Sequence, residues 1–540
     1  MRVGILLACW AACIAAFWQL HEHGFSYSGI SLITTGVCLA FLTIIAIHRI
    51  FFSPLAPFPG PWLAAATYGY EFYYDIWPHT FRYMWKIREL HETYGPIVRI
   101  NPTHLHVLDA SFYEEIHPSD TRRKRERDRW FSGQDENVLG VGGLTQTIGH
   151  DLHRTRRSAI APLFSKKNIY ELQPLVKKKV DKLVDRFSQA CKEGTVINLV
   201  NAMSALTMDV ISSYCFGKDM RQLDKPEFAA QVVWEMLQGS KVSGPARHMP
   251  WLFDVLLNLP PWFLRLVHPQ YPEEDPSQML RDRMQYILDH PDEPSEDGNI
   301  TIVHTIKDSN LPPKERTADR LAIEAATFLG AGTETTGRVL AVTAYYLVAN
   351  VDLLARLREE LKTVMPTPDT EAPLSELEKL PFLTAVLQEG LRLANGVSGR
   401  MPRVAPVETL IYHARDKQNQ VDKVWEIPPG TAVSMSIYLL HHDEEIFPDS
   451  HSFKPDRWID NMPLRQHLYA FAKGTRGCLG SNLAWSELYQ TIAIIFRRFD
   501  LRLYDTIESR DVEIVRDFSI AGMDPSSLGI RVKVVEELIA

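Results

Sequence analysis

The sequence is poor in cysteine. Its 540 residues include six cysteines and no Cys-x-x-Cys pair, which excludes a disulfide framework and a zinc site built from cysteine alone. A strong net charge is also missing: 58 basic and 66 acidic side chains leave −8, which argues against a nucleic-acid-binding protein. We find no internal repeat and no flexible spacer after residue 61. These absences favour one large globular unit.

Two long apolar runs lie near the N-terminus, at residues 3–20 and 30–47. Each has about 18 residues, just above the lower limit of about 17 for crossing a bilayer. The alternatives are a cleaved signal peptide, for which no convincing small-residue cleavage site is present, and a buried core helix. We expect residues 1–53 to form a membrane anchor with one or two transmembrane helices.

Charges around these runs predict their orientation. Arg2 precedes the first run, Arg49 follows the second, and the loop 21–29 contains no Lys or Arg. The positive-inside rule places both ends of such a hairpin in the cytosol, and a single span, the simpler alternative, also leaves the body there. Residues 54–61 are rich in proline and predict a short stiff linker. The sequon at Asn299 would be modified only in a lumen, so we predict that it is unmodified.

Helical periodicity dominates the body, residues 62–540. The clearest pattern covers 319–350, contains no proline and is apolar on most sides, which predicts a long helix through the core. A second helix is predicted over 375–393, where Ser375 and Glu378 have capping-box spacing. Short strand-like runs occur near residues 97–100, 104–108, 409–412 and 431–437. The predicted fold class is therefore mainly α with a small β component.

Cys478 has a distinctive context just before a helical pattern at 481–496. Its neighbours combine an aromatic residue, a cation and small residues: Phe471, Arg476, Gly474 and Gly480. A helix start and a nearby arginine favour the thiolate, and glycines let a flat group approach the backbone. Phe471 can shield the site from water. A lone thiolate in such a pocket is typical of a ligand of haem iron, whereas an isolated cysteine is more often an inert buried thiol.

These residues resemble the haem-binding signature of the cytochrome P450 family, Phe-x-x-Gly-x-Arg-x-Cys-x-Gly, at all five fixed positions. A chance match in this length is about one in ten thousand from average residue usage. The resemblance covers about residues 54–535. It implies the cytochrome P450 fold for residues 62–540 and haem b with Cys478 as the axial iron ligand. It also implies cofactor contacts from three residues: Phe471, Arg476 and Gly480.

Residues 331–336 resemble the family's oxygen-activation motif. The resemblance implies that Gly332 opens room beside the iron and that Glu334 and Thr335 relay protons. The alternative for Thr335 is a hydroxyl bonded to the carbonyl group one turn back.

A third motif of the family, Glu-x-x-Arg, matches Glu389 and Arg392. Alone this spacing is weak, because such ion pairs are common on helix surfaces. The resemblance implies a buried ion network that Arg457 completes. Such a network is costly unless complete, so losing one member should be severe.

Haem carries two propionates, which need donors. Arg476 is one, and Arg403 aligns with the family's propionate-binding arginine. The family often has Trp-x-x-x-Arg in an early helix; here His153 replaces the Trp and Arg157 keeps the Arg, with surface charge as the alternative for Arg157. The basic run 122–129 is interpreted as a solvated face, with contact to anionic lipid as the alternative.

The resemblance as a whole implies a membrane-bound haem-thiolate monooxygenase that inserts one oxygen atom of O2 into an apolar small molecule. Electrons would come from a separate NADPH–cytochrome P450 reductase at the endoplasmic reticulum. Residues 441–453 and 482–489 look like fungal enzymes of the trichodiene oxygenase kind, which implies a terpenoid or polyketide substrate. Residues 393–397 depart from the family's Pro-Pro pair, so the pocket shape is not implied.

Two other functions stay open. A haem-thiolate isomerase or dehydratase would need no O2, but the retained Glu334 and Thr335 count against it. A non-catalytic haem-binding sensor would bind the cofactor and consume no NADPH.

Overall fold

The structure is a computed structural model. It describes residues 26–132, 142–257, 259–260, 262–263, 266, 276–290, 301–415 and 422–538. Helices make up most of it and small sheets the rest, so the predicted mainly α fold with a small β component is confirmed. The first apolar run and Asn299 lie outside the described residues.

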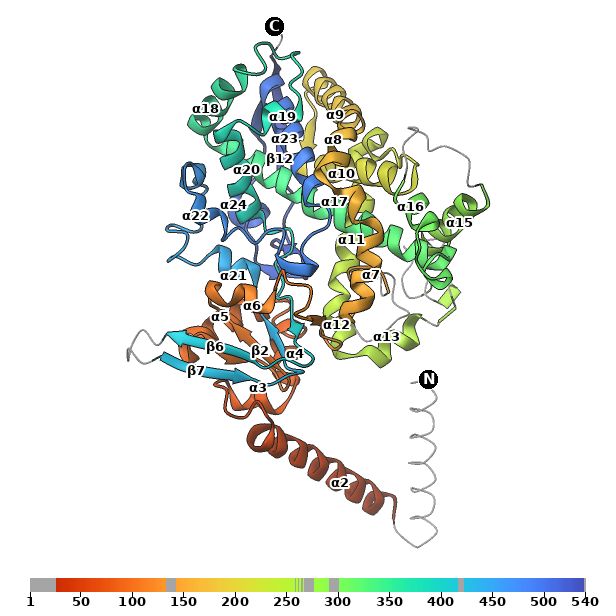
Figure 1. Cartoon of the computed structure of the whole chain (residues 1–540), viewed down its shortest axis with the longest axis vertical. Coiled ribbons are helices and arrows are strands. Elements are labelled where there is room, and N and C mark those ends of the chain that lie inside the picture. Colours follow the sequence, from red (N-terminus) through yellow and green to blue (C-terminus); the bar gives the residue numbers. More distant parts are fainter. Residues whose placement is uncertain are drawn as a thin grey trace.

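The helix α17 (Ala318–Ala349) is the centre of the core, as its apolar pattern predicts (Figure 1). Its 32 residues begin where the Thr317 hydroxyl accepts a hydrogen bond from a free N–H group of the first turn. It packs against α10 (Leu199–Phe216), α20 (Pro381–Ala394) and α23 (Ser481–Arg498). Because these helices surround α17, side chains along it face protein rather than solvent.

The helix predicted over 375–393 is in fact two helices, α19 (Leu374–Leu377) and α20. The break precedes Pro381, since a proline disfavours helical backbone in the residue before it. The carboxylate of Glu360 replaces the predicted capping box, because it accepts hydrogen bonds from two N–H groups at the start of α20, at 2.8 and 2.7 Å. Proline and a distant cap therefore set where α20 begins.

The largest sheet has five strands in the order β1-β2-β8-β5-β3. Their bounds are β1 Ile97–Arg99, β2 His104–Val107, β8 Ala432–Ser434, β5 Arg403–Val404 and β3 Glu126–Arg127. The pair β2 and β8 is parallel and the other pairs are antiparallel. The short pair β3 and β5 places Arg127 opposite Arg403, far apart in sequence.

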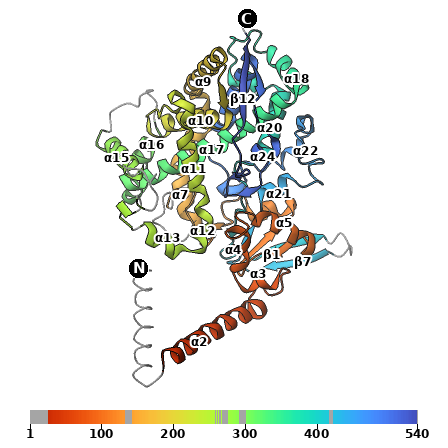
Figure 2. The same cartoon turned by 180° about the vertical axis from the view of Figure 1, so that it is seen from behind.

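Smaller sheets complete the β component. They are β4-β12-β9 (Val196–Asn198, Arg531–Glu537, Phe499–Leu503), β6-β7 (Leu410–Arg415, Asp422–Ile427) and β10-β11 (Arg516–Asp517, Ala521–Gly522). The sheet β4-β12-β9 lies near the end of the molecule that carries the C-terminus, and β6-β7 lies near the opposite end (Figures 1 and 2).

At its N-terminal end the described chain forms α2 (Tyr27–Ile47), continued by one π-helical turn, η1 (His48–Phe52). This helix extends away from the body (Figures 1 and 2). Residues Ser31–Phe52 are long and apolar enough to cross a membrane, and none of this stretch is buried. The helix α10 also passes the length and composition test, but 89% of it is buried. The N-terminal helix is therefore the candidate membrane anchor, and α10 belongs to the core.

The proline-rich segment 54–61 packs on the body. Leu55 and Phe58 are buried, and the Phe58 ring stacks on Trp425 with 5.1 Å between centroids. The backbone N–H of Arg99 donates to Pro59 O at 2.7 Å, and the Arg99 guanidinium donates to Arg49 O at 2.9 Å. The segment thus fixes the end of the anchor against the sheet. The domain boundaries at residues 53 and 61 remain a prediction.

Candidate active site

Cys478 lies in a tight loop between the short helix η8 (Gly474–Arg476) and α23. Its N–H donates to Phe471 O at 2.8 Å, which folds the loop back on itself. Gly474 has φ +75°, and a Cβ there would overlap the His117 carbonyl group, so the fold itself demands glycine.

Gly480 is different. Its φ is −84°, and a Cβ there would meet no described atom within 4 Å. Neither backbone strain nor packing within the described chain therefore requires glycine at this position. Room kept open two residues from Cys478 fits a flat group that lies against the loop.

The Cys478 thiol is accessible, although protein atoms crowd it on its other sides. Burial raises its pKa, while a hydrogen bond from the Gly480 N–H and the charge of Arg157 lower it. The net shift is upward, so the predicted thiolate preference is not a property of the chain alone. The cation next to the sulfur is Arg157, whose Nη1 donates to Gly477 O at 2.9 Å, and not Arg476. Metal coordination would remove the thiol proton.

Arg476 points away from the sulfur. Its guanidinium donates to Arg125 O at 3.2 Å, Thr147 O at 2.6 Å and Ile148 O at 2.7 Å. Arg403 is buried in β5 and donates to Pro402 O at 3.1 Å. Within the described ranges, no carboxylate lies within 4.0 Å of either guanidinium. Both cations are therefore held by carbonyl groups and have no ion pair within the described residues, although the charge of Glu126 acts on Arg476 from farther away.

The helix α7 (His150–Ile160) adds His153 and Arg157 to this region. Burial, followed by the charges of Arg476, Arg157 and Arg403, lowers the pKa of His153 to about 3. His153 is therefore neutral at pH 7 and keeps one N–H donor. Arg157 is half-buried against the Cys loop, so the surface alternative does not apply to it.

Arg127 is a member of this cluster that the sequence did not single out. The basic run 122–129 is solvated at Arg122, as interpreted, but Arg125 is buried and pairs with Glu408 at 2.6 Å. Arg127 itself pairs across β3 and β5 with Arg403. Two-residue strands are too short to show a periodicity, so no pattern in the sequence indicated this pairing.

The four arginines 127, 157, 403 and 476 form what we call the arginine cluster. Burial, then the charges of Arg127 and Arg476, lowers the pKa of Arg403 to about 9. Burial, then the charge of Arg127, lowers the pKa of Arg476 to about 10. Like charges buried together are unfavourable, and a group with two carboxylates would offset that cost. The donor set fits a bound group that carries two carboxylates, such as the two propionates of a haem.

On α17, Thr335 Oγ1 donates to Ala331 O at 2.8 Å, which is the one-turn hydrogen bond considered as the alternative. Burial raises the pKa of Glu334 to about 7, against the opposing charge of Arg338. Glu334 can therefore exchange a proton near neutral pH. At Gly332 a Cβ would lie 3.0 Å from the Ile211 side chain, so this glycine lets α10 approach α17; its predicted role beside the iron stays a prediction.

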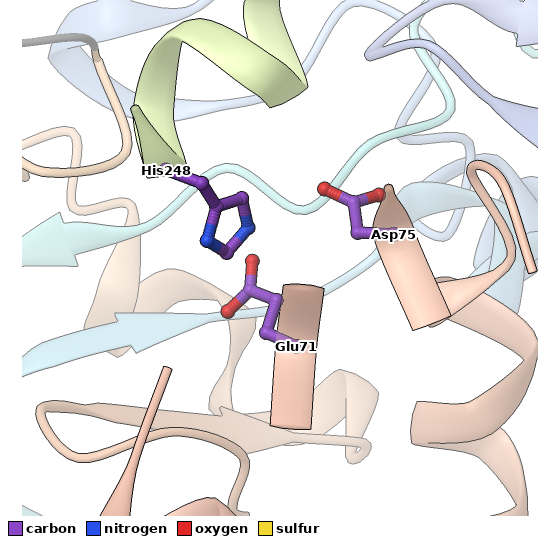
Figure 3. Close-up of side chains that lie close together, drawn as sticks. All are labelled: Glu71, Asp75 and His248. Atoms are coloured by element: carbon purple, nitrogen blue, oxygen red, sulfur yellow. The ribbon is translucent and has the colours of Figure 1, made fainter. Parts of the chain in front are cut away.

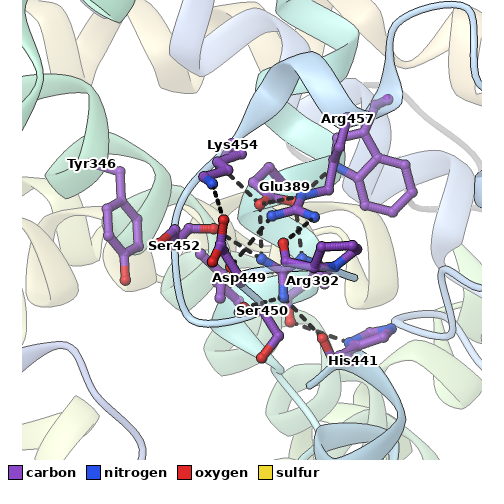
Figure 4. A network of polar contacts seen from close by, with 12 residues as sticks. Tyr346, Glu389, Arg392, His441, Asp449, Ser450, Ser452, Lys454 and Arg457 are labelled. Carbon is purple, nitrogen blue, oxygen red and sulfur yellow. Dashed lines mark hydrogen bonds and ion pairs between the residues drawn. The ribbon is translucent and has the colours of Figure 1, made fainter. Parts of the chain in front are cut away.

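The structure brings Glu389, Arg392 and Arg457 together in a network of polar contacts (Figure 4). Both oxygens of Glu389 accept from Arg392, at 2.8 and 2.9 Å, and Oε1 also accepts from Arg457 Nε at 3.1 Å. The Trp458 indole N–H and the Lys454 backbone N–H complete the carboxylate shell, at 2.8 and 2.9 Å. The network is buried and every charge in it has a partner.

One other cluster resembles a metal site. Glu71, Asp75 and His248 have ligand atoms within 4.8 Å of one another (Figure 3). However, Glu71 Oε1 already accepts from Arg400 at 2.6 Å and from Arg247 at 3.3 Å. The two guanidinium groups disfavour a metal cation at the same carboxylate, so we interpret these residues as a buried ion cluster.

The accessible thiol, the open face at Gly480 and the arginine cluster define a site of the haem-thiolate class. Comparisons with known proteins agree. Residues 70–526 match the family model described as Cytochrome P450. The cytochrome P450 monooxygenase tpcC of Cochliobolus heterostrophus is 40% identical over 507 residues, covering 91% of this chain and 94% of the relative.

Two further relatives are similar over most of their length. The cytochrome P450 monooxygenase TRI4 of Trichoderma arundinaceum is 37% identical over 511 residues, covering 91% of this chain and 94% of the relative. The tryptophan 6-hydroxylase fscE of Fusarium equiseti is 37% identical over 496 residues, with the same coverage of both chains.

The chain belongs to the cytochrome P450 family, as its motifs predict, and its relatives are fungal. It is an oxidoreductase of the monooxygenase type, which incorporates oxygen from O2. Its relatives therefore favour the monooxygenase over the isomerase and sensor alternatives. Family membership implies a haem-thiolate iron cofactor, a redox partner and a small-molecule substrate.

Proposed function

We propose that Cys478 is the thiolate ligand of a haem b and that the arginine cluster holds its propionates. The observation that carries this proposal is the convergence of four arginines without carboxylate partners in the described chain, around a loop that leaves its thiol accessible. Arg157 braces the Cys loop, and neutral His153 supplies one more donor. Phe471 covers the loop, with its ring packed on Trp485 at 6.0 Å between centroids.

When bound, the haem supplies the binding and activation of O2. The chain supplies the protons. Glu334 lies one residue before Thr335 on α17, and its pKa of about 7 lets it both accept and give a proton. The Thr335 hydroxyl donates to Ala331 O and can turn to accept from a water or donate to substrate oxygen. We propose Glu334 and Thr335 as the proton relay.

The proposed substrate is an apolar small molecule of fungal secondary metabolism, a terpenoid or a polyketide. The likeness of residues 441–453 and 482–489 to enzymes of the trichodiene oxygenase kind supports this class, whereas the similarity to the tryptophan 6-hydroxylase fscE points to an aromatic amino acid as the alternative. A panel that contains a terpene, a polyketide aromatic and tryptophan separates the two. Oxygenated product from tryptophan alone would overturn the proposed class.

We further propose that the electrons come from NADPH–cytochrome P450 reductase and that the protein is anchored in the endoplasmic reticulum with its body in the cytosol. Three exposed tryptophans support a membrane-facing end: Trp62 is 69%, Trp251 53% and Trp262 66% exposed. The helices α3 (Trp62–Ala66) and α13 (Pro250–Leu257) lie at the end from which α2 extends (Figures 1 and 2). Exposed apolar side chains at that end fit contact with the bilayer.

The deciding experiment is the spectrum of the reduced protein under carbon monoxide. The full chain should show the red-shifted Soret band of a sulfur-ligated haem, and Cys478→Ala should lose it. Cys191→Ala is the matched control, because Cys191 lies in α9 (Gln173–Glu193), remote in sequence from the motif. A band that survives in Cys478→Ala would overturn the proposal.

A further inference from the structure

The turn that follows α20 rests directly on α17 beside Thr335. A Cβ on Gly396 would lie 3.0 Å from Thr335 Cβ, 3.2 Å from its Cα and 3.3 Å from its carbonyl oxygen. Gly396 does not have a positive φ, so the backbone does not demand glycine there. The reason for glycine is therefore close approach: any side chain would push the turn away from the helix, or Thr335 away from its place.

The turn is held from its own side by Asn395, the C-cap of α20, which has φ +43°. Its side-chain amide donates to Arg392 O at 2.7 Å, and its oxygen lies 3.0 Å from His441 Nδ1. These contacts fix the shape of the turn. They do not connect it to α17.

Arg338 makes that connection. It lies one turn after Glu334 on α17, and its Nε donates to Ala394 O at 2.9 Å. Ala394 is the last residue of α20, where a helix leaves its carbonyl groups without partners and favours a cation. The contact therefore ties the end of α20 to α17 just beside the Gly396 approach.

The rest of the Arg338 guanidinium is also engaged. Nη2 donates to Val512 O at 3.0 Å, and Nη1 lies 2.7 Å from Met523 Sδ. Arg338 is buried, and in the described part of the chain no carboxylate lies within 4.0 Å of it. A buried arginine that meets only carbonyl groups and a thioether is an expensive way to fill space, which a neutral side chain would do better. Its charge and its fork geometry therefore have a specific use.

We propose that Arg338 is a positioning residue which, by fastening the Asn395–Gly396 turn to α17, sets the place of the Thr335 hydroxyl. This inference rests on the proposed relay through Glu334 and Thr335. It predicts that Arg338 and Gly396 govern how efficiently electrons from NADPH end in product, although neither residue handles a proton itself.

The first test measures product formed per NADPH consumed, with the full-length membrane-bound protein, its reductase and an accepted substrate. Gly396→Ala and Arg338→Gln should lower this ratio about tenfold and release the lost electrons as peroxide, with an unchanged carbon monoxide band. The magnitude follows from geometry, because a misplacement of about 1 Å can cost about 100-fold in rate. An unchanged ratio in both variants would overturn the inference.

The second test asks whether the effect passes through Thr335. In a Thr335→Ala background, Gly396→Ala should cause no further loss of coupling, since the hydroxyl that it displaces is already gone. A merely structural role of the turn would give losses that multiply. Multiplying losses would therefore contradict the proposal even if each single variant is impaired.

The third test separates the charge of Arg338 from its shape. Arg338→Lys keeps a cation near Glu334, which with Tyr346 is the titratable group of α17 that acts on Arg338, but loses the fork. It should uncouple like Arg338→Gln while the pH midpoint of coupling stays near that of the wild type. Arg338→Gln should move that midpoint upward, because the positive charge that lowers the pKa of Glu334 is lost.

Arg358 provides the matched control. In α18 (Val351–Lys362) it also donates to carbonyl groups at a helix end, Phe496 O at 3.0 Å and Phe499 O at 2.8 Å, and unlike Arg338 it has a carboxylate partner, Asp500 at 3.2 Å. Arg358→Gln should lower thermal stability and leave coupling unchanged. Amide hydrogen exchange over residues 330–337 should rise in Arg338→Gln and not in Arg358→Gln, a readout that does not depend on turnover.

These outcomes separate the two proposals. A missing carbon monoxide band, or full coupling in Thr335→Ala, would overturn the proposed function. An intact band with uncoupling in Thr335→Ala, but normal coupling and normal exchange in the Gly396 and Arg338 variants, would overturn this inference alone.

Discussion

Two groups of buried arginines in this protein are built on opposite principles. In the network around Glu389, Arg392 and Arg457 share one carboxylate whose oxygens are fully surrounded by donors. In the arginine cluster, Arg403 and Arg476 face carbonyl groups and one another. The first group is complete within the chain, whereas in the described residues Arg403 and Arg476 have no carboxylate within 4.0 Å, and we propose that the haem propionates supply their counter-charge.

The difference teaches which group serves the fold and which serves a ligand. A buried charge with all its partners stabilises one arrangement of the chain. Removing one partner leaves the remaining charges unpaired in an apolar interior. A buried cation without a partner raises the free energy of the folded chain until a counter-charge arrives. We therefore interpret buried arginines with carboxylate partners as structural, and buried arginines without such partners as candidates for ligand binding.

The largest effect is expected from breaking the complete network. Glu389→Ala should destabilise the protein by about 4 kcal/mol, because it leaves two buried guanidinium groups without their carboxylate. The measurement is denaturant unfolding, or the yield of folded protein if too little survives. Glu359→Ala is the control, since Glu359 pairs with Lys362 at the same i,i+3 spacing on an exposed helix face and should cost less than about 1 kcal/mol. Equal losses in the two variants would erase the distinction.

Loss of two members of the arginine cluster should weaken haem binding and leave folding stability largely unchanged, the opposite of the effect of Glu389→Ala. Arg403→Ala combined with Arg476→Ala should weaken haem retention about 100-fold, because two charge-assisted contacts to propionates are lost, each contributing about 1.5 kcal/mol. Haem transfer to a competing acceptor measures this retention. The unfolding free energy of the haem-depleted protein should not fall as it does for Glu389→Ala. Arg122→Ala, in the exposed part of the basic run 122–129, should change neither haem retention nor the unfolding free energy.

The two groups also differ in how far the sequence predicts them. The Cys478 loop and the Glu389–Arg392 pair are short contiguous motifs. A few neighbouring residues in the sequence are therefore enough to predict them. Arg127 joins the arginine cluster only through a two-residue strand pair, which leaves no periodicity to detect. The roles of Gly332 and Gly396 depend on long-range contacts. Ile211 approaches Gly332 and Thr335 approaches Gly396, and no spacing in the sequence indicates either contact.

The long helix α17 was predictable for the same reason as the loop, since its 32 residues repeat one local pattern. The start of α20 was not, because the local capping-box spacing competed with Pro381 and with a cap supplied by Glu360 from another helix. Local patterns thus predicted which helices form. Partners distant in the sequence determine where those helices end and which charged side chains meet between them.

The ion cluster at Glu71 and Asp75 sharpens the comparison, because it holds both situations one helical turn apart on α4 (Gly69–Asp75). Burial raises the pKa of Glu71, but Arg400 and Arg247 outweigh it and hold the pKa at about 2. Burial raises the pKa of Asp75 to about 7. The charge of Arg247, whose Nη2 lies 3.9 Å away, lowers this pKa too little to offset burial, and the like charge of Glu71 raises it further. Glu71 has two close guanidinium partners, whereas Asp75 has only the longer contact to Arg247.

The signs of their pH dependence are therefore opposite. Ionised Glu71 stabilises the fold above its unfolded pKa of about 4.5, and this contribution is lost as the pH falls toward 2. Asp75 has a folded pKa of about 7, above its unfolded value of 3.8, so its contribution lowers stability progressively as the pH rises from about 3.8 to about 7 and then stays constant. Asp75→Asn should raise stability at pH 8 by about 3 kcal/mol more than at pH 5, because about two pH units separate pH 5 from the folded pKa. Glu71→Gln should lower stability at both pH values, since both lie above its unfolded pKa. Thermal unfolding of the two variants at pH 5 and pH 8 checks this, and a shift of the same sign in both variants at pH 8 would show that partner geometry does not decide the contribution of a buried charge in this protein.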